Sequence, residues 1–143
     1  MNLNRFRFED AKGVVVTAKN TRDCKAAEVL VAGDIVKIKD VASPITVVEK
    51  ITAATDAIFG VVAFDTAYAN GAKAGEIVNV AYDYSIIKME TNAAVAAGAD
   101  LMAVVNGMKV DTATDGQTAF GQACIKAGEG ELVPVMLYAS YTV

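Results

Sequence analysis

Apolar and polar residues alternate in short runs along most of this chain, which is the pattern of β-strands that bury one face. Tight-turn pairs such as Asn70-Gly71, Asn106-Gly107 and Asp115-Gly116 separate the runs. The alternation predicts strands over residues 14–17, 35–39, 45–48, 58–62, 77–84, 101–105, 108–110, 120–125 and 132–138. Many short strands at close spacing predict an all-β fold, a compact sandwich or barrel.

Three short segments depart from this alternation. Residues 20–23 read Asn-Thr-Arg-Asp and predict a polar turn. Residues 25–28 suit one helical turn, and residues 91–98 combine a capping candidate, a run of alanine and a closing glycine. Both are too short for a stable helix. We therefore expect at most one or two short helical turns packed on the sheets.

One pattern occurs twice. Phe59-Gly60 is followed by Gly75-Glu76 and an apolar strand, and Phe120-Gly121 is followed by Gly130-Glu131 and another apolar strand. A glycine directly after a large ring indicates a bulge or a close approach of two backbones. Repeats of this length usually form one supersecondary unit each, so we predict a single β domain over 14–143 with similar units at residues ~32–84 and ~98–138.

The first thirteen residues differ from the rest of the chain. Arg5, Phe6, Arg7 and Phe8 alternate cation and aromatic ring, which in an extended strand places both rings on one face and both arginines on the other. Two interpretations stand side by side: an ordinary first strand of the sheet, or an arm that lies on a partner, with its rings in apolar grooves and its arginines on carboxylates. We assign residues 1–13 as an extended N-terminal arm.

The strand over residues 132–138 contains a proline. Pro134 cannot donate a backbone hydrogen bond, so we expect this strand at a sheet edge or irregular at that point. Its alternate residues Leu132, Pro134, Met136 and Tyr138 are the candidates for an interface between subunits.

Composition narrows the possible partners. Hydrophobic residues make up 54% and charged residues 21%, which predicts a folded globular protein. The net charge of −4 offers no broad basic surface for nucleic acid. The sequence shows no membrane span and no secretory leader, so we expect no membrane partner. A high mean hydropathy favours burial of apolar surface against further copies of the chain.

The sequence offers few candidate residues for catalysis or metal binding. The chain has no histidine and two cysteines, Cys24 and Cys124, so it cannot form histidine-dependent nucleophile pairs or histidine-ligated metal sites. The glycine-rich stretch 71–76 lacks the Gly-Lys-Ser/Thr of a phosphate loop, and residues 111–122 lack two ligands of a calcium loop. We expect no catalytic residue, no cofactor and no bound metal, and therefore not an enzyme.

Four acids stand at repeated positions. Asp34 and Asp100 form one pair and Glu76 and Glu131 the other, each just before a strand and beside or one residue after a glycine. Paired carboxylates can hydrolyse glycosides, but acids before strands are expected in turns. We assign all four to turns.

These repeated motifs resemble a known family. Residues 32–36, 58–62 and 75–80, with their echoes in the second unit, are similar to the pattern of tailed-bacteriophage capsid cement proteins, also called head decoration proteins. The resemblance covers residues 30–138; the segment before it and the rings Phe59 and Phe120 before glycine depart from the pattern.

The resemblance implies a non-enzymatic virion protein, made in the bacterial cytoplasm, that binds the outside of an icosahedral head. It implies the major capsid protein and further copies of the chain, commonly in trimers, as partners. Arg5, Phe6, Arg7 and Phe8 would then be a capsid-binding arm. The alternative is a stand-alone β module that binds carbohydrate or a cell surface, for which Tyr82, Tyr84 and Tyr138 are the candidate platform.

Overall fold

The structure is a computed structural model that describes residues 11–41, 45–68 and 70–143. These residues form eleven strands and one short 3-10 turn. In chain order the elements are β1 (Val15–Thr17), β2 (Asn20–Ala26), β3 (Ile35–Val41), β4 (Thr46–Lys50), β5 (Gly60–Val62), η2 (Thr66–Tyr68), β6 (Ile77–Tyr82), β7 (Ile86–Glu90), β8 (Asp100–Val104), β9 (Lys109–Thr112), β10 (Thr118–Ala123) and β11 (Leu132–Thr142).

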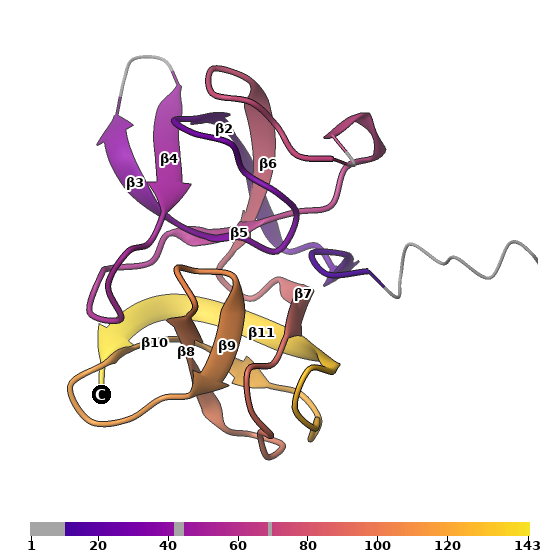
Figure 1. The fold of residues 1–143 in the computed structure, drawn as a ribbon, viewed down its shortest axis with the longest axis vertical. Helices are drawn as coiled ribbons and strands as arrows, with labels where there is room; N and C mark the ends of the chain where they lie inside the picture. Colours follow the sequence, from indigo (N-terminus) through magenta and orange to yellow (C-terminus); the bar gives the residue numbers. More distant parts are fainter. Residues whose placement is uncertain (1–10, 42–44, 69) are drawn as a thin grey trace, which may run out of the picture.

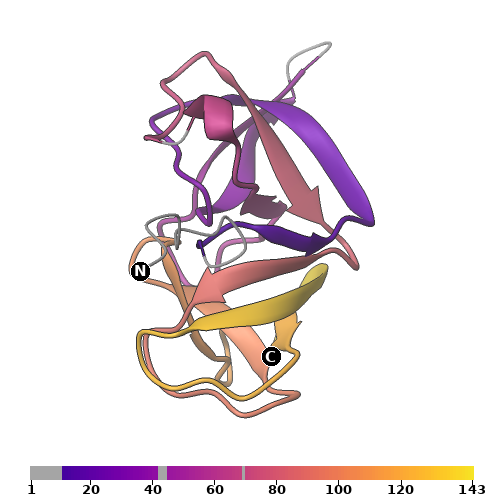
Figure 2. The same cartoon turned by 90° about the vertical axis from the view of Figure 1, so that its right-hand side faces the viewer.

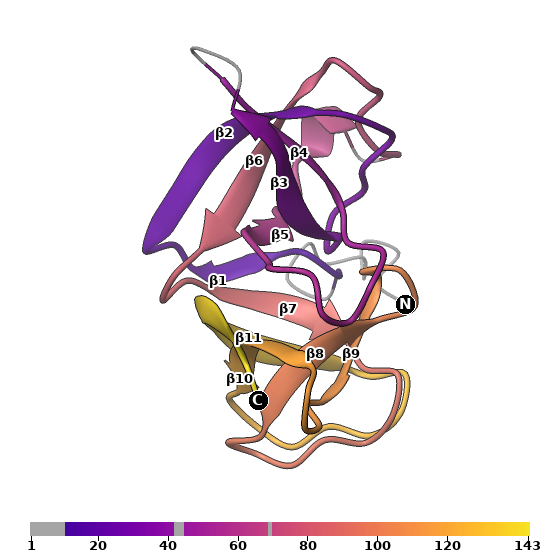
Figure 3. The ribbon, with the colours of Figure 1, turned by 90° about the vertical axis from the view of Figure 1, so that its left-hand side faces the viewer.

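The strands form two sheets, which lie one above the other in Figure 1. Strands β2, β4, β3, β5 and β6 close into a barrel in that order. The second sheet has the order β1-β7-β11-β10-β8-β9, and its strand β1 lies between the barrel and the rest of that sheet (Figures 2 and 3). The predicted all-β fold built from two similar units is confirmed.

The two halves of the chain share one strand plan, in which β2 to β6 correspond to β7 to β11. The first strand of each half pairs with the last, as β2 with β6 and β7 with β11. In the first half the Ala26 N–H donates to Glu76 O (2.9 Å), and in the second half the Thr91 N–H donates to Glu131 O (2.9 Å). We call β2–β6 the first half and β7–β11 the second half.

Single bridges outside the strands repeat as well. Leu30 pairs with Ala72 in the first half, and Val95 pairs with Ala127 in the second. The parallel pairing of β2 with β4 that closes the barrel has a one-residue counterpart, the parallel bridge between Thr91 and Val110. The structural repeat therefore begins earlier than the sequence pattern indicates, at β2 and β7.

The register corrects one predicted correspondence. Val36 lies opposite Gly60, and Leu101 lies opposite Gly121, so Val36 corresponds to Leu101. By the same register the counterpart of Asp34 is Ala99, one residue before Asp100. The expected match of Asp34 with Asp100 is wrong because the second half places one more residue between its glycine and its acid.

The repeated glycines mark close backbone approaches. A Cβ atom on Gly121 would lie 2.6 Å from Val135 Cγ1, and one on Gly60 would overlap Ala81 O. The pairing of β10 also shifts register between Ala119 and Gly121, as in a β-bulge. The expectation of a bulge or close approach after the ring is confirmed, and Phe120 turns into the core, where it is 1% exposed.

The hydrophobic core runs through both sheets. Ile35, Ile51, Val61 and Ala81 of the first half pack in one cluster with side chains of the second half, namely Ile87, Met89, Val95, Leu101, Ala103, Val110, Phe120, Ala123, Val133, Val135 and Leu137. A second cluster fills the barrel itself. Burial on this scale is the main stabilising term of such a fold.

Backbone hydrogen bonds also join the halves. The Ile35 N–H donates to Gly107 O (2.8 Å), which places the β8–β9 turn against the barrel. At the N-terminal side, the Gly13 N–H donates to Lys88 O (2.7 Å) and Gly13 O accepts from the Phe64 N–H (2.8 Å). Gly13 is thus held in the body of the protein, although the sequence assigns it to the arm.

Four local predictions are wrong. Residues 20–23 belong to β2 instead of a turn, because pairing with β6 overrides their polar character. Residues 25–28 and 91–98 form no helix, since they take part in pairing with strands and single bridges. Pro134 lies inside the sheet, where β11 pairs with both β7 and β10. The proline is tolerated because β10 ends at Ala123, so its missing N–H faces the end of that strand.

The β8–β9 turn contains a strained residue. Val105 has φ 55° and Asn106 has φ 54°, both in the left-handed region. Asparagine tolerates this region, but a β-branched residue does so at a cost of about 1–2 kcal/mol. Val105 is 45% exposed, so little burial compensates for the strain.

Replacing Val105→Asn should therefore stabilise the protein by about 1 kcal/mol, which raises the melting temperature by about 3 °C for a chain of this size. Calorimetry of both proteins measures the shift. Val29→Asn is the matched control, because Val29 is 57% exposed and is not among the residues with positive φ. A gain of the same size in the control would contradict the strain at Val105.

Candidate interaction surfaces

The predicted arm residues Arg5, Phe6, Arg7 and Phe8 lie outside the described residues, and their role stays a prediction. The described part of the chain begins at residue 11, and contacts of Lys12 hold it against the body of the protein. Lys12 Nζ donates to Met108 O (3.2 Å), and the Lys12 side chain packs against Gly33. A deletion that tests the arm should therefore end at Asp10, because removal of Lys12 and Gly13 would disturb the body.

The four predicted interface residues share one face of β11. Leu132, Pro134, Met136 and Tyr138 are partly exposed and alternate with buried residues of the same strand. They lie on the outer face of the six-stranded sheet. Because β11 is an interior strand, a partner would contact these side chains and could not extend the sheet at this strand. Their role as an interface between subunits stays a prediction.

The neighbouring strands place both apolar and charged residues beside this face. Met136 lies opposite Ile86 on β7 and Gln122 on β10, whereas Pro134 lies opposite Lys88 and Leu132 opposite Glu90. The face thus combines apolar side chains with charged neighbours.

Two tyrosines share one carboxylate at the end of this face. Tyr138 Oη donates to Asp100 Oδ1 (2.8 Å) and Tyr141 Oη donates to Asp100 Oδ2 (3.2 Å), with the ring centroids 5.7 Å apart. Burial and the hydrogen bond to Asp100 raise the pKa of Tyr138, so the phenol stays protonated. The arrangement ties β11 to β8 and leaves the Tyr141 ring 47% exposed.

The three tyrosines of the predicted aromatic platform lie in different surroundings. Tyr82 stacks on Phe59, with ring centroids 5.1 Å apart. Tyr84 lies beyond the end of β6 with φ 70°, so the strand predicted over residues 77–84 ends before it. Tyr138 donates a hydrogen bond to Asp100 within the six-stranded sheet.

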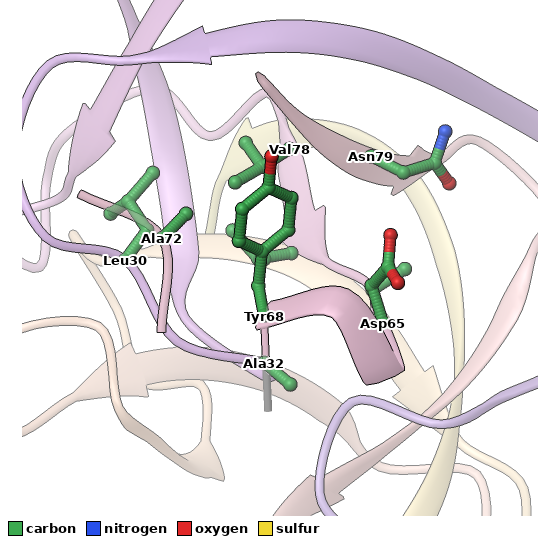
Figure 4. A pocket seen from close by; sticks show the side chains of 9 residues that line it. Leu30, Ala32, Asp65, Tyr68, Ala72, Val78 and Asn79 are labelled. Carbon is green, nitrogen blue, oxygen red and sulfur yellow. The ribbon is translucent and has the colours of Figure 1, made fainter. Parts of the chain in front are cut away.

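A small hollow opens beside the 3-10 turn of the first half. Tyr68 points its ring among apolar side chains, as Figure 4 shows. The space left is about 10 Å³, enough for one water at most. The hollow is lined by Leu30, Ala32, Val62, Ala63, Asp65, Tyr68, Ala72, Val78 and Asn79. The sequence predicts only a loop of small residues here, because a single tyrosine gives no periodic signal.

The repeated glutamates support turns. Glu76 Oε1 accepts from the Lys73 N–H (2.6 Å), and Glu131 Oε1 accepts from the Gly128 N–H (2.6 Å). Among the described residues, no three His, Cys, Asp or Glu side chains are placed to hold one metal ion. The two cysteines are unpaired, with Cys24 buried and Cys124 exposed. In the same part of the chain, no helix is long and apolar enough to cross a membrane.

Asp34 differs from the other acids because it is buried, at 1% exposure. Its Oδ2 accepts from the Val31 N–H (2.8 Å), whereas no hydrogen-bond partner within the described residues reaches Oδ1. Burial raises the pKa of Asp34, an effect that the Val31 bond and the charges of Lys50 and Lys12 partly oppose. Its counterpart in the second half is an alanine, so the shared strand plan does not require a carboxylate here.

No protein-family model matches this sequence, and no curated protein matches it. Among solved structures, the fold is similar to the N base of head fibre gp8.5 in bacteriophage phi29, with a TM-score of 0.59 and 17% sequence identity. The similarity covers 87% of this chain and 98% of that chain. At this identity it establishes a shared fold.

Asp34→Asn should change the pH dependence of stability. The folded state holds the proton of Asp34 more tightly than the unfolded chain does, so the wild type loses stability as the pH rises through the raised pKa. Asparagine has the same size and no charge. Relative to the wild type, the variant should gain stability in denaturant titrations as the pH rises above the ordinary pKa of an aspartate. Parallel stability curves would show that Asp34 is not held neutral in the fold.

Proposed function

We propose that this protein is a structural protein of a bacteriophage particle, bound to the outside of the head. The observation that carries the proposal is the fold similarity to a head-fibre base, which extends over almost the whole of both chains. The repeated Gly-Glu strand starts support it independently, because they resemble those of head decoration proteins.

The partner is the major capsid protein, and several copies of the chain bind together as a trimer. The apolar outer face of β11 supports contact between copies, because Leu132, Pro134 and Met136 offer partly exposed apolar surface on a rigid interior strand. Many weak contacts repeated around a symmetric shell bind by avidity and need no single tight site. In this role the protein clamps neighbouring capsid subunits from outside.

The capsid-binding arm is Arg5, Phe6, Arg7 and Phe8. Its arginines suit carboxylates on the shell, since a guanidinium binds a carboxylate through two parallel hydrogen bonds. Its rings suit shallow apolar grooves. The body that follows holds Lys12 and Gly13 in place, so the arm extends from a defined point.

Binding to heads that lack this protein tests the proposal. The full chain should sediment with such heads, and density for it should appear on their outer surface in electron microscopy. Arg5→Ser combined with Arg7→Ser should reduce the bound fraction by about tenfold or more, since each bidentate contact contributes roughly 1.5–3 kcal/mol.

The matched control removes two cations elsewhere. Lys39 and Lys73 are exposed in the first half, and Lys39→Ser with Lys73→Ser changes the net charge equally. This variant should bind heads almost as the wild type does. Equal losses of head binding in both variants would show a general charge effect and would refute the role of the arm in binding. Failure of the wild type to bind any head would refute the proposed function.

The exposed ring of Tyr141 beside Tyr138 favours a second candidate, a carbohydrate-binding module. Aromatic faces stack on sugar rings through apolar contact. A glycan array probed with the wild type and with Tyr141→Ala separates the two functions. Binding of a defined glycan that the variant loses would favour the second candidate.

A further inference from the structure

The chain contains three pairs in which glycine directly follows an asparagine or an aspartate. They are Asn70-Gly71, Asn106-Gly107 and Asp115-Gly116. Asparagine is one of the thermolabile residues of proteins. In such a pair the glycine nitrogen can attack the side-chain carbonyl carbon and close a succinimide ring, because glycine has no Cβ atom to hinder the approach. The attack needs a nitrogen that is not held in a hydrogen bond, so the fold decides which pair reacts.

The glycine nitrogen is held in two of the three pairs. The Gly71 N–H donates to Tyr68 O (2.8 Å), and the Gly116 N–H donates to Val143 O (2.8 Å). The Gly107 N–H, by contrast, donates to no acceptor in the part of the chain that the structure describes. The pair in the β8–β9 turn is therefore the one with an available nucleophile.

The surroundings of Asn106 favour the same reaction. Asn106 is exposed, and its side-chain amide makes no hydrogen bond within the described residues. Asn106 and Gly107 both line an open hollow of about 290 Å³, which gives water access to the pair. The preceding Val105 is strained at φ 55°, which lowers the cost of leaving this turn geometry. The turn thus combines a free nitrogen, a free amide and access for water.

We propose that Asn106 is a site of spontaneous modification, where asparagine converts to aspartate and isoaspartate. The Gly107 nitrogen forms a bond to Asn106 Cγ, and the side-chain amide group leaves as ammonia with the proton of the Gly107 N–H. Water then opens the succinimide at either of its two carbonyl groups. One opening yields aspartate, and the other yields isoaspartate, whose main chain runs through the side-chain carbons. Solvent water is the co-reactant, and no group is oxidised or reduced.

The modified turn lies at a joint between the two halves. The Ile35 N–H donates to Gly107 O (2.8 Å). A Cβ atom on Gly107 would lie 2.8 Å from Ile35 O, so the joint has no room for a longer main chain. Isoaspartate should therefore displace Gly107 and loosen the joint. Aspartate tolerates the left-handed region as asparagine does and should leave the joint intact. This inference is independent of the proposed function.

Peptide mapping by mass spectrometry tests the proposal on the unchanged protein after incubation at neutral pH. Trypsin places the three pairs in separate peptides, residues 51–73, 89–109 and 110–126. Asn106 should lose its amide about tenfold faster than Asn70, because Gly71 must first break its hydrogen bond. Fragment spectra distinguish Asn106 from Asn92 in the same peptide, and isoaspartate should accumulate at Asn106.

The same chain unfolded in guanidinium chloride is the matched control. Without structure the nitrogens of both Asn-Gly pairs are free, so Asn70 and Asn106 should react at similar rates. A preference for Asn106 that disappears on unfolding would show that the fold selects this site. Equal rates in the folded protein, faster reaction of Asn70, or no conversion of Asn106 would each overturn the proposal.

Amide hydrogen exchange measures the effect on the joint. In the purified isoaspartate form the Ile35 N–H should exchange about tenfold faster than in fresh protein, because its acceptor Gly107 O is displaced. Asn106→Asp adds the charge without the additional main-chain atom and should leave this exchange unchanged. The Leu30 N–H, which donates to Ala72 O (3.0 Å), is the internal reference. Unchanged exchange at Ile35 in the isoaspartate form would refute the loosening of the joint.

Discussion

The close approach of two backbones at Gly60 and again at Gly121 is the constraint on which both halves depend. Neither position has room for a Cβ atom, because the neighbouring strand β6 or β11 lies directly against it. At this contact β5 pairs with β6 in the first half, and β10 pairs with β11 in the second. The ring beside Gly121 then enters the core that both sheets share. The strand plan, the register and the joint core all follow from this packing.

Much of the fold could be predicted because it rests on local patterns. The period-two alternation located most strands, and the glycine after a ring located the close approach. Errors arose where distant pairing decided the structure. Residues 20–23 are polar, yet they form β2 because β6 supplies their partners. The alanine run over 91–98 has helical composition, but its backbone bonds go to Val110 and Ala127 instead. The local sequence contains no signal for pairing partners that lie far away along the chain.

The candidate surfaces were less predictable, for physical reasons that differ among them. The alternation in β11 correctly placed Leu132, Pro134, Met136 and Tyr138 on one face, because strand periodicity fixes faces. The sequence did not predict that β11 lies inside the sheet, since a proline is tolerated there only because of where β10 ends. The equivalence of Asp34 with Ala99 could not be found from sequence, because it appears only once the register is known.

The pairing of the first strand of each half with the last has a consequence for synthesis of the chain. While the chain emerges from the ribosome, β2 cannot pair until β6 has been synthesised, and β7 cannot pair until β11 has been synthesised. The barrel can close when Tyr82 has emerged, but four of its apolar side chains stay exposed until the second half arrives to share their core. A barrel closed at this stage would have a bare apolar end. Its folding is completed late, and association of such intermediates is the step at which this topology is most prone to aggregate.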